Sequence, residues 1–159
     1  MNRATQQKIA KSLESGLRQS GIQTICVKAK EVVTNTETPK EYDLIAVGAP
    51  TEWLSASKSM KEFLENLKIV DLSGKYGFAF DTKLSRPLSG SAAKLIEKEL
   101  KNQGAKIIAE HESAIVYGTG SSMSSMTLKE GEGARFQEIG HRVGTVLVSA
   151  ARGEALKAV

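Results

Sequence analysis

The most constraining feature of this 159-residue chain is a short apolar run, Asp43-Leu-Ile-Ala-Val-Gly48, which is closed by Ala49-Pro50. A strand without polar alternation is typical of a parallel sheet that is covered on both faces. Further along the chain, strand-like and helix-like segments alternate. Because parallel neighbours are joined by helical crossovers, this alternation predicts an α/β fold, a doubly wound parallel sheet in three layers.

Hydrophobic spacing divides the chain into helices and strands. Four segments carry an apolar stripe at helical spacing and are expected to be helices: residues 4–19, 57–67, 90–103 and 130–151. Four others are apolar or rich in β-branched residues and are expected to be strands: residues 22–27, 43–48, 75–80 and 105–117, the last interrupted near His111. A single domain over residues 1–159, with its core over about 4–151, accounts for this length.

The stripes of the predicted helices identify the expected core. Its members are Ile9, Leu13, Leu17, Met60, Phe63, Leu64, Leu67, Ala92, Ala93, Ile96, Leu100, Phe136, Ile139, Val143, Val146 or Leu147, and Ala150. Cys26 lies inside a predicted strand, and we expect it to be a small core side chain because free cysteine is commonly buried. Thr5 and Ser89 have the side chains of helix caps and are expected to cap the first and third helices.

Composition and charge exclude several functional classes. The apolar runs are far shorter than the roughly 18–20 residues that span a bilayer, and no apolar segment follows Met1 as it would in a signal peptide. The single cysteine cannot form an internal disulfide and fits a reducing compartment, so we expect a cytoplasmic protein. The net charge is +4, but basic residues are interleaved with acidic ones and aromatic residues are sparse. We therefore expect no nucleic-acid partner and no membrane partner.

Three segments are expected at the edge of the sheet where ligands bind in this fold class, beyond the carboxyl ends of the strands. They are Asn2–Gln6, Ala49–Ser57 and Asp81–Ser91, and all are rich in hydroxyl or amide side chains. None contains Gly-x-Gly-x-x-Gly or a Walker lysine, which excludes the usual dinucleotide and P-loop signatures. His111 and His141 have no carboxylate or cysteine at metal-ligand spacing, so no metal site is expected.

Segments along the chain carry a resemblance to a known family, in the family's order. They are Ala4-Thr-Gln-Gln-Lys-Ile-Ala-Lys-Ser-Leu-Glu-Ser-Gly-Leu17, Tyr42-Asp-Leu-Ile-Ala-Val-Gly-Ala-Pro-Thr51, Lys58–Leu64 with Leu72–Phe80, and Phe80-Asp-Thr-Lys-Leu84 with Pro87-Leu-Ser-Gly-Ser-Ala-Ala93. Together they resemble the flavodoxin-like FMN-binding proteins over residues 4–117, and the last helix resembles them loosely. The resemblance implies the flavodoxin-like order of strands in a doubly wound sheet.

The resemblance also implies one non-covalently bound FMN at the three edge segments. The residues that it places against the cofactor are Arg3, Ala4, Thr5 and Gln6 at the phosphate, Pro50, Thr51, Glu52, Trp53 and Leu54 along the rings, and Asp81, Thr82 and Lys83 at the pyrimidine edge. Stacking of Trp53 on the rings would contribute about 0.5–1.5 kcal/mol beyond the buried area. The alternative for this side chain is packing against the following helix.

Two departures from the family concern its first strand and its phosphate loop. The family has a strand before the position of Asn2, between the strands predicted here at 22–27 and 43–48. Without that strand the ladder groups of both neighbours lack partners. Three outcomes are open: the neighbours close into a four-stranded sheet, another chain supplies the strand, or the sequence is truncated at its start, which we favour. Ala4, Thr5 and Gln6 stand where the family has Gly-Asn-Thr.

We interpret the chain as an electron-transfer protein of flavodoxin type that carries one or two electrons on FMN. No acid–base pair stands out, so no catalytic residue is assigned and enzymatic activity is left open. One alternative is an FMN-dependent NAD(P)H quinone or nitro reductase, which would need an open ring face and usually a homodimer. A second alternative is a flavodoxin-like interaction module that has lost its flavin, which the departure at Ala4–Gln6 favours. The redox partner proteins stay unassigned.

Overall fold

The computed structural model describes residues 3–33, 38–52, 55–85, 90–118 and 126–157. The strands are β1 (Leu44–Glu52), β2 (Ser55–Ala56), β3 (Tyr76–Leu84), β4 (Lys106–Ile107), β5 (Glu112–Tyr117) and β6 (Thr127–Leu128). They form one sheet in the order β2-β1-β3-β5-β6, with β4 also paired to β3. β1, β4 and β5 run parallel to β3, whereas β2 and β6 are short antiparallel additions.

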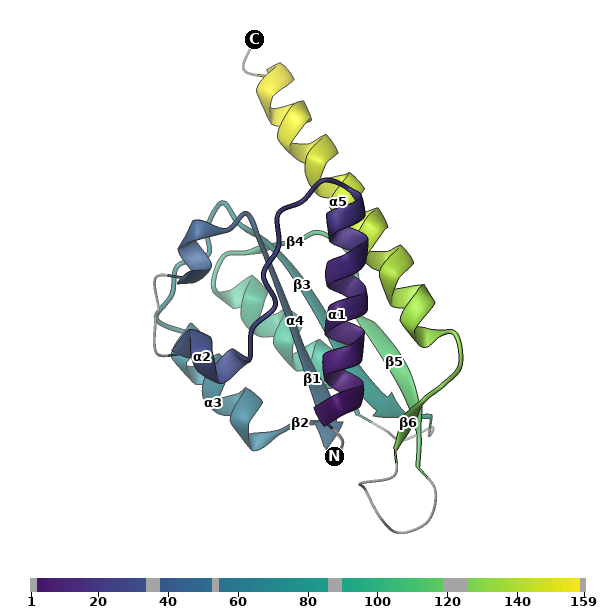
Figure 1. Ribbon diagram of the computed structural model, residues 1–159. Helices are drawn as coiled ribbons and strands as arrows, with labels where there is room; N and C mark the ends of the chain where they lie inside the picture. The colour runs from purple at the N-terminus through teal and green to yellow at the C-terminus, as the bar shows by residue number, and fades with distance from the viewer. Residues whose placement is uncertain (1–2, 34–37, 53–54, 86–89, 119–125, 158–159) are drawn as a thin grey trace.

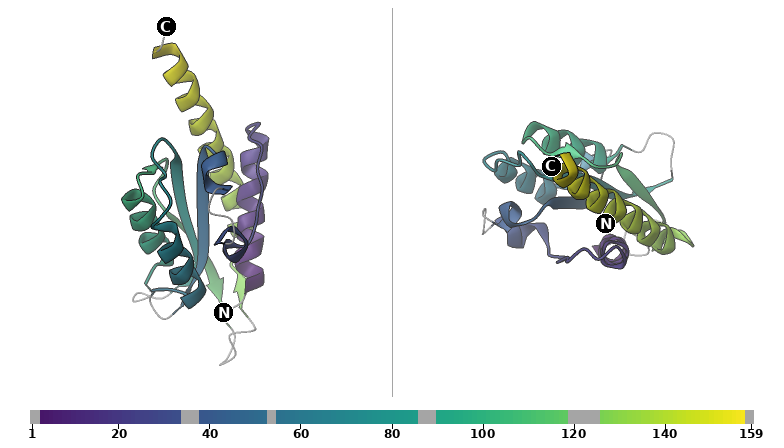
Figure 2. Two further views of the ribbon diagram at one scale, coloured as in Figure 1. Left: turned by 90° about the vertical axis from the view of Figure 1, so that its left-hand side faces the viewer. Right: turned by 90° about the horizontal axis from the view of Figure 1, so that it is seen from above.

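Helices cover both faces of this sheet and make a three-layer molecule (Figure 1 and Figure 2). The helices are α1 (Arg3–Gln19), α2 (Ala29–Val33), α3 (Lys58–Leu67), α4 (Ala92–Asn102) and α5 (Glu132–Lys157), with a 3-10 helix, η1 (Thr38–Glu41), before β1. Phe78 and Phe80 of β3 pack with α1 and α5, while Ala79 of the same strand packs with α3 and α4. Because side chains alternate along a strand, β3 contributes to both apolar layers. The predicted α/β, doubly wound fold is confirmed.

The four predicted helices are confirmed as α1, α3, α4 and α5. Their predicted apolar stripes are buried except at Ala150, which is half-buried, and the open choice on the last helix falls on Leu147, since Val146 is 48% exposed. Two expected caps are wrong. Thr5 lies inside the first turn of α1, and the side chain that caps α4 is Ser91. The expected cap Ser89 lies outside the described residues.

The strand predicted at residues 22–27 is wrong. Residues 22–28 have no regular secondary structure, and Ile25 and Val27 are 55% and 48% exposed. A β-branched sequence becomes a strand only when a neighbouring ladder accepts its hydrogen bonds, and no strand in the described part of the chain pairs with this segment. Cys26 is accordingly half-buried rather than a core residue, although its partial burial raises the pKa of the thiol, an effect that nearby Lys11 opposes.

β1 is therefore an edge strand for most of its length, and the closing of its neighbours into a four-stranded sheet is not observed. Among the described residues, Leu44–Pro50 pairs only with β3, and β2 touches the other edge only at Thr51 and Glu52. Burial on both faces had been expected for this run, but Ala46 is exposed. The apolar sequence of β1 thus borders an open sheet edge.

Two strands extend further than predicted, and both extensions reach the expected ligand edge. β1 continues through Pro50, Thr51 and Glu52, and β3 continues through Asp81–Leu84. Residues that had been expected in loops are thus held in the sheet ladder, with Ala49 opposite Asp81 and Pro50 opposite Thr82. No helix in the described part of the chain is long and apolar enough to cross a membrane.

Candidate functional site

The candidate site lies at the carboxyl ends of β1 and β3. Figure 1 shows the N-terminal end of α1 at the same end of the molecule as the arrowheads of these two strands. α4 also begins there, and its cap, Ser91, lies ten residues after Asp81. The edge therefore collects the ends of two strands and the N-termini of α1 and α4, and backbone N–H groups at such termini attract negative charge.

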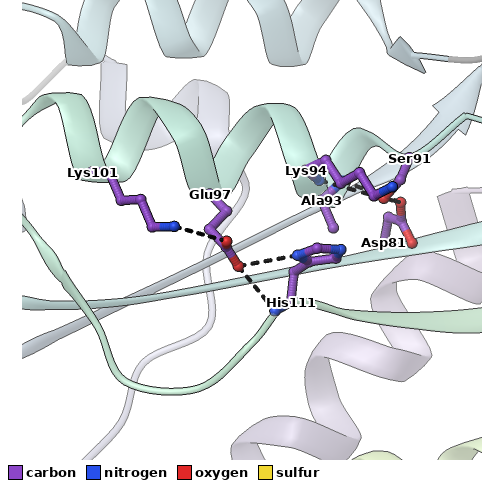
Figure 3. Close-up of polar contacts among 7 residues, drawn as sticks. All are labelled: Asp81, Ser91, Ala93, Lys94, Glu97, Lys101 and His111. Carbon is purple, nitrogen blue, oxygen red and sulfur yellow. Dashed lines mark hydrogen bonds and ion pairs between the residues drawn. The ribbon is translucent and has the colours of Figure 1, made fainter.

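A buried carboxylate organises one half of this edge. Asp81 has no exposed surface. Its Oδ2 accepts hydrogen bonds from the hydroxyl of Thr51 at 2.9 Å, from the hydroxyl of Ser91 at 2.8 Å and from the backbone N–H of Ala93 at 3.1 Å. Figure 3 shows Asp81 facing Ser91 and Ala93 in the first turn of α4. One carboxylate oxygen thus accepts donors from β1, from the helix cap and from the backbone of α4.

Thr51 and Ser91 extend the same network to the helix. The hydroxyl of Thr51 accepts from the N–H of Ala92 at 2.9 Å, and the hydroxyl of Ser91 accepts from the N–H of Lys94 at 3.4 Å. The first N–H groups of α4 are therefore satisfied by side chains from β1, β3 and the cap itself. Such groups otherwise have no partner within a helix.

An amide and a hydroxyl organise the other half of the edge. The Thr82 hydroxyl donates to Oε1 of Gln6 on α1 at 3.0 Å. This amide lies against β1 where Gly48 carries no side chain, since a Cβ at Gly48 would be 2.5 Å from Nε2 of Gln6. Nε2 itself is buried and has no hydrogen-bond partner in the described part of the chain. Oδ1 of Asp81 is the second buried polar atom in this condition.

Most of the residues predicted from the sequence lie at this edge, but their side chains differ in how far they are buried. Thr51, Asp81 and Thr82 are buried, Gln6 and Lys83 are half-buried, and Ala4 is exposed. Arg3 begins α1, Thr5 is buried in its first turn, and Pro50 and Glu52 belong to β1. Trp53 and Leu54 lie outside the described residues.

Sequence reasoning placed Ser91 in the polar segment after Asp81 but gave the cap of the helix to Ser89, and it assigned no role to Gly48. The position of Ser91 directly before Ala92 and Ala93 is a helix-start signal that could have identified it as the cap. No local signal reveals Gly48, because its role depends on the approach of Gln6 from another element.

A second polar cluster fixes the middle of α4. Glu97 on α4 accepts hydrogen bonds from the backbone N–H of His111 at 3.0 Å and pairs with the ring Nδ1 at 3.1 Å, and Lys101 lies 3.3 Å from its other oxygen (Figure 3). Burial opposes ionisation of Glu97, but these hydrogen bonds outweigh it and lower the pKa of the carboxyl. No group of three metal-ligating side chains occurs in the ranges that the structure describes.

The architecture of the chain is similar to that of several solved structures. A flavodoxin from the domain Archaea is 18% identical, with a TM-score of 0.68 over 92% of this chain and 93% of that one. Flavodoxin 1 from Bacillus cereus is 16% identical, with a TM-score of 0.73 over 94% and 92%. The chain has a flavodoxin-like fold. No protein-family model and no curated protein matches its sequence.

The flavodoxin-like fold also occurs as one part of larger proteins. Rubredoxin oxygen:oxidoreductase from Desulfovibrio gigas is 16% identical, with a TM-score of 0.73 over 91% of this chain but only 33% of that protein. The present chain thus corresponds to whole flavodoxins and to about a third of that enzyme. At such identities the likeness establishes the fold, and the chemistry of the flavodoxin-like chain must be argued from its own residues.

Proposed function

We propose that this chain binds one FMN non-covalently at the carboxyl edge of its sheet and serves as an electron carrier. The observation that carries the proposal is the meeting of the α1 N-terminus with the ends of β1 and β3, beside a buried amide donor, Nε2 of Gln6, that lacks a partner among the described residues. The three structural neighbours described above are two flavodoxins and an oxidoreductase, which supports the same chemistry.

The side chains at this edge fit such a cofactor. FMN offers a phosphate, sugar hydroxyls and a ring with both donors and acceptors. Nε2 of Gln6 is an unpaired donor in the first turn of α1, so a polar ligand group that reached it would relieve the cost of its burial. The first turn of α1, at Arg3–Gln6, would receive the phosphate. The ends of β1 and β3 would border the rings.

Each predicted contact has a physical role in this proposal. The hydroxyl of Thr51 is already used by Asp81 and Ala92, so Pro50–Glu52 would contribute backbone groups. Trp53 would cover one ring face and exclude water from it. Lys83 would place a positive charge near the rings. When bound, FMN supplies the redox chemistry by accepting one or two electrons.

Titration of the flavin-free protein with FMN tests the proposal directly. Trp53 is the only tryptophan, so its fluorescence reports on stacking. We expect quenching that saturates at one FMN per chain, and weaker binding of riboflavin because it lacks the phosphate. Thr5→Val should weaken FMN more than riboflavin, while Thr145→Val, whose hydroxyl donates to the backbone carbonyl of His141 on the exposed face of α5, should change neither. A colourless protein that takes up no FMN would contradict the proposal.

Two alternatives make different predictions in the same experiment. An FMN-loaded protein that oxidises NADPH and reduces a quinone would be a reductase. An interaction module without flavin would fold normally and ignore FMN, and one observation favours it: Gln6 turns its amide into the sheet toward Thr82, away from the solvent side of α1.

We also propose that the carrier works in the cytoplasm with a protein redox partner. Cys26, the single cysteine, is a free thiol, which fits a reducing compartment. The net charge of +4 favours a partner with an acidic docking face.

A further inference from the structure

Burying the carboxylate of Asp81 at its position costs free energy of folding. A carboxylate with no exposed surface loses its hydration, and only hydrogen bonds or opposite charge offset that loss. Oδ2 is well satisfied by three donors, but the buried Oδ1 has no partner in the described ranges. Core packing alone would be served by an apolar side chain. The free-energy cost of burying this carboxylate therefore indicates a role that an apolar side chain could not fill.

The carboxylate joins three parts of the fold that are distant in sequence. Asp81 belongs to β3, Thr51 lies 30 positions earlier near the end of β1, and Ser91 lies ten positions later at the start of α4. Because one oxygen receives a bond from each of the other two parts, none can move away without breaking it. These are the strand ends and the helix start that would border the flavin rings.

The carboxylate also occupies the N-terminus of α4 in place of an external anion. Its negative charge lies at the positive end of the helix dipole and accepts the N–H of Ala93. Ala92 and Lys94 donate to Thr51 and Ser91, both of which donate to Asp81. A ligand phosphate would find none of these three N–H groups available at α4.

We propose that Asp81 is a positioning residue that acts as an internal anion, binding the end of β1 to the start of α4. By holding these elements together, Asp81 sets the geometry and the electrostatic field of the part of the site that would bind the flavin rings. This effect on the cofactor rests on the proposed flavin function. Asp81 touches no substrate in this role and acts through Thr51, Ser91 and the backbone of α4.

The first test needs no flavin. Amide hydrogen exchange at Ala92, Ala93 and Lys94 is compared in wild type, Asp81→Ala and Asp81→Asn. We expect Asp81→Ala to lose protection at these amides by about tenfold or more, the equivalent of one lost hydrogen bond. Formate, a carboxylate small enough for the vacated space, should restore it. Asp81→Asn keeps an acceptor oxygen and should retain most of the protection.

Asp71 provides the matched control. It is another aspartate that accepts a backbone N–H, from Ser73, but it is exposed and precedes β3 at the other end of the sheet. Asp71→Ala should leave exchange at the start of α4 unchanged, with or without formate. Unchanged exchange in Asp81→Ala would overturn the internal-anion role, and so would an equal loss in Asp71→Ala.

The second test uses the FMN-loaded protein. Asp81→Asn keeps the hydrogen bonds but removes a buried negative charge, which should stabilise reduced flavin and shift the midpoint potential upward. Asp81→Ala should also raise the FMN dissociation constant by about tenfold. Unchanged potential and affinity in both variants would overturn the coupling to the cofactor. A wild type that takes up no FMN would reject the proposed function instead, while the exchange experiment still decides the role of Asp81 in the fold.

Discussion

Gln6 and Thr82 are 76 positions apart in the sequence, and the hydroxyl of Thr82 donates a hydrogen bond to Oε1 of Gln6 at 3.0 Å. This contact ties the first turn of α1 to the carboxyl end of β3. It mirrors, on the opposite face of the sheet, the bonds that Asp81 makes to the start of α4, since adjacent residues of a strand point to opposite faces. The starts of α1 and α4 are thus both held by side chains of one strand.

Gly48 is expected to tolerate no side chain beneath Gln6. A Cβ there would overlap the Phe80 ring and approach Nε2 of Gln6 to 2.5 Å. Gly48→Ala should lower the free energy of unfolding by about 1–3 kcal/mol, the usual cost of overpacking. Urea unfolding measures the loss. Gly133→Ala, where the nearest atom outside the α5 backbone is 3.6 Å away, is the control and should be neutral or slightly stabilising.

Gly140 is expected to be essential for the close approach of α5 to α1. A Cβ at Gly140 would overlap the carbonyl oxygen of Leu13, a backbone atom that cannot turn aside. Gly140→Ala should therefore separate the two helices and cost about 3 kcal/mol or more of stability, above the loss at Gly48. Thermal unfolding beside the same Gly133→Ala control measures it. A variant as stable as wild type would contradict the packing of α1 on α5.

The open edge of β1 should be visible in hydrogen exchange. Tyr76 donates its N–H to the carbonyl of Asp43, so the backbone groups of Asp43 and of every second residue after it face β3. The amides of Ile45, Val47 and Ala49 should exchange slowly. Those of Leu44, Ala46 and Gly48 face the open edge and should exchange faster. Equal protection of the two sets would mean that another segment covers this edge in solution.

Glu97 should make stability fall in acid. Hydrogen bonds from His111 lower the pKa of its carboxyl in the folded state, so the folded state binds fewer protons than the unfolded state. The stabilisation is present above the unfolded pKa, about 4.3 for a glutamate, and is lost as the pH falls through the folded pKa. Thermal unfolding against pH measures this loss. Glu97→Gln should flatten it, whereas Glu62→Gln, an exposed residue of α3, should not.

Patterns of neighbouring residues were sufficient to predict the helices. The stripe of Met60, Phe63, Leu64 and Leu67 repeats with the helical period, and all four side chains are buried in α3 as expected. The α/β class followed in the same way from alternating segments. Helical hydrogen bonds and helical faces are local, so a window of a dozen residues contains most of the signal.

Contacts between distant segments could not be predicted from such local patterns. Ile22–Val27 has the composition of a strand but forms none, because a strand requires a partner that local sequence does not specify. The sequence alone marked Thr51 and Asp81 as polar residues at an expected ligand edge. Only the tertiary structure decided that they bond to one another and to the first turn of α4, since the parallel register that brings Ala49 opposite Asp81 is a property of the assembled sheet.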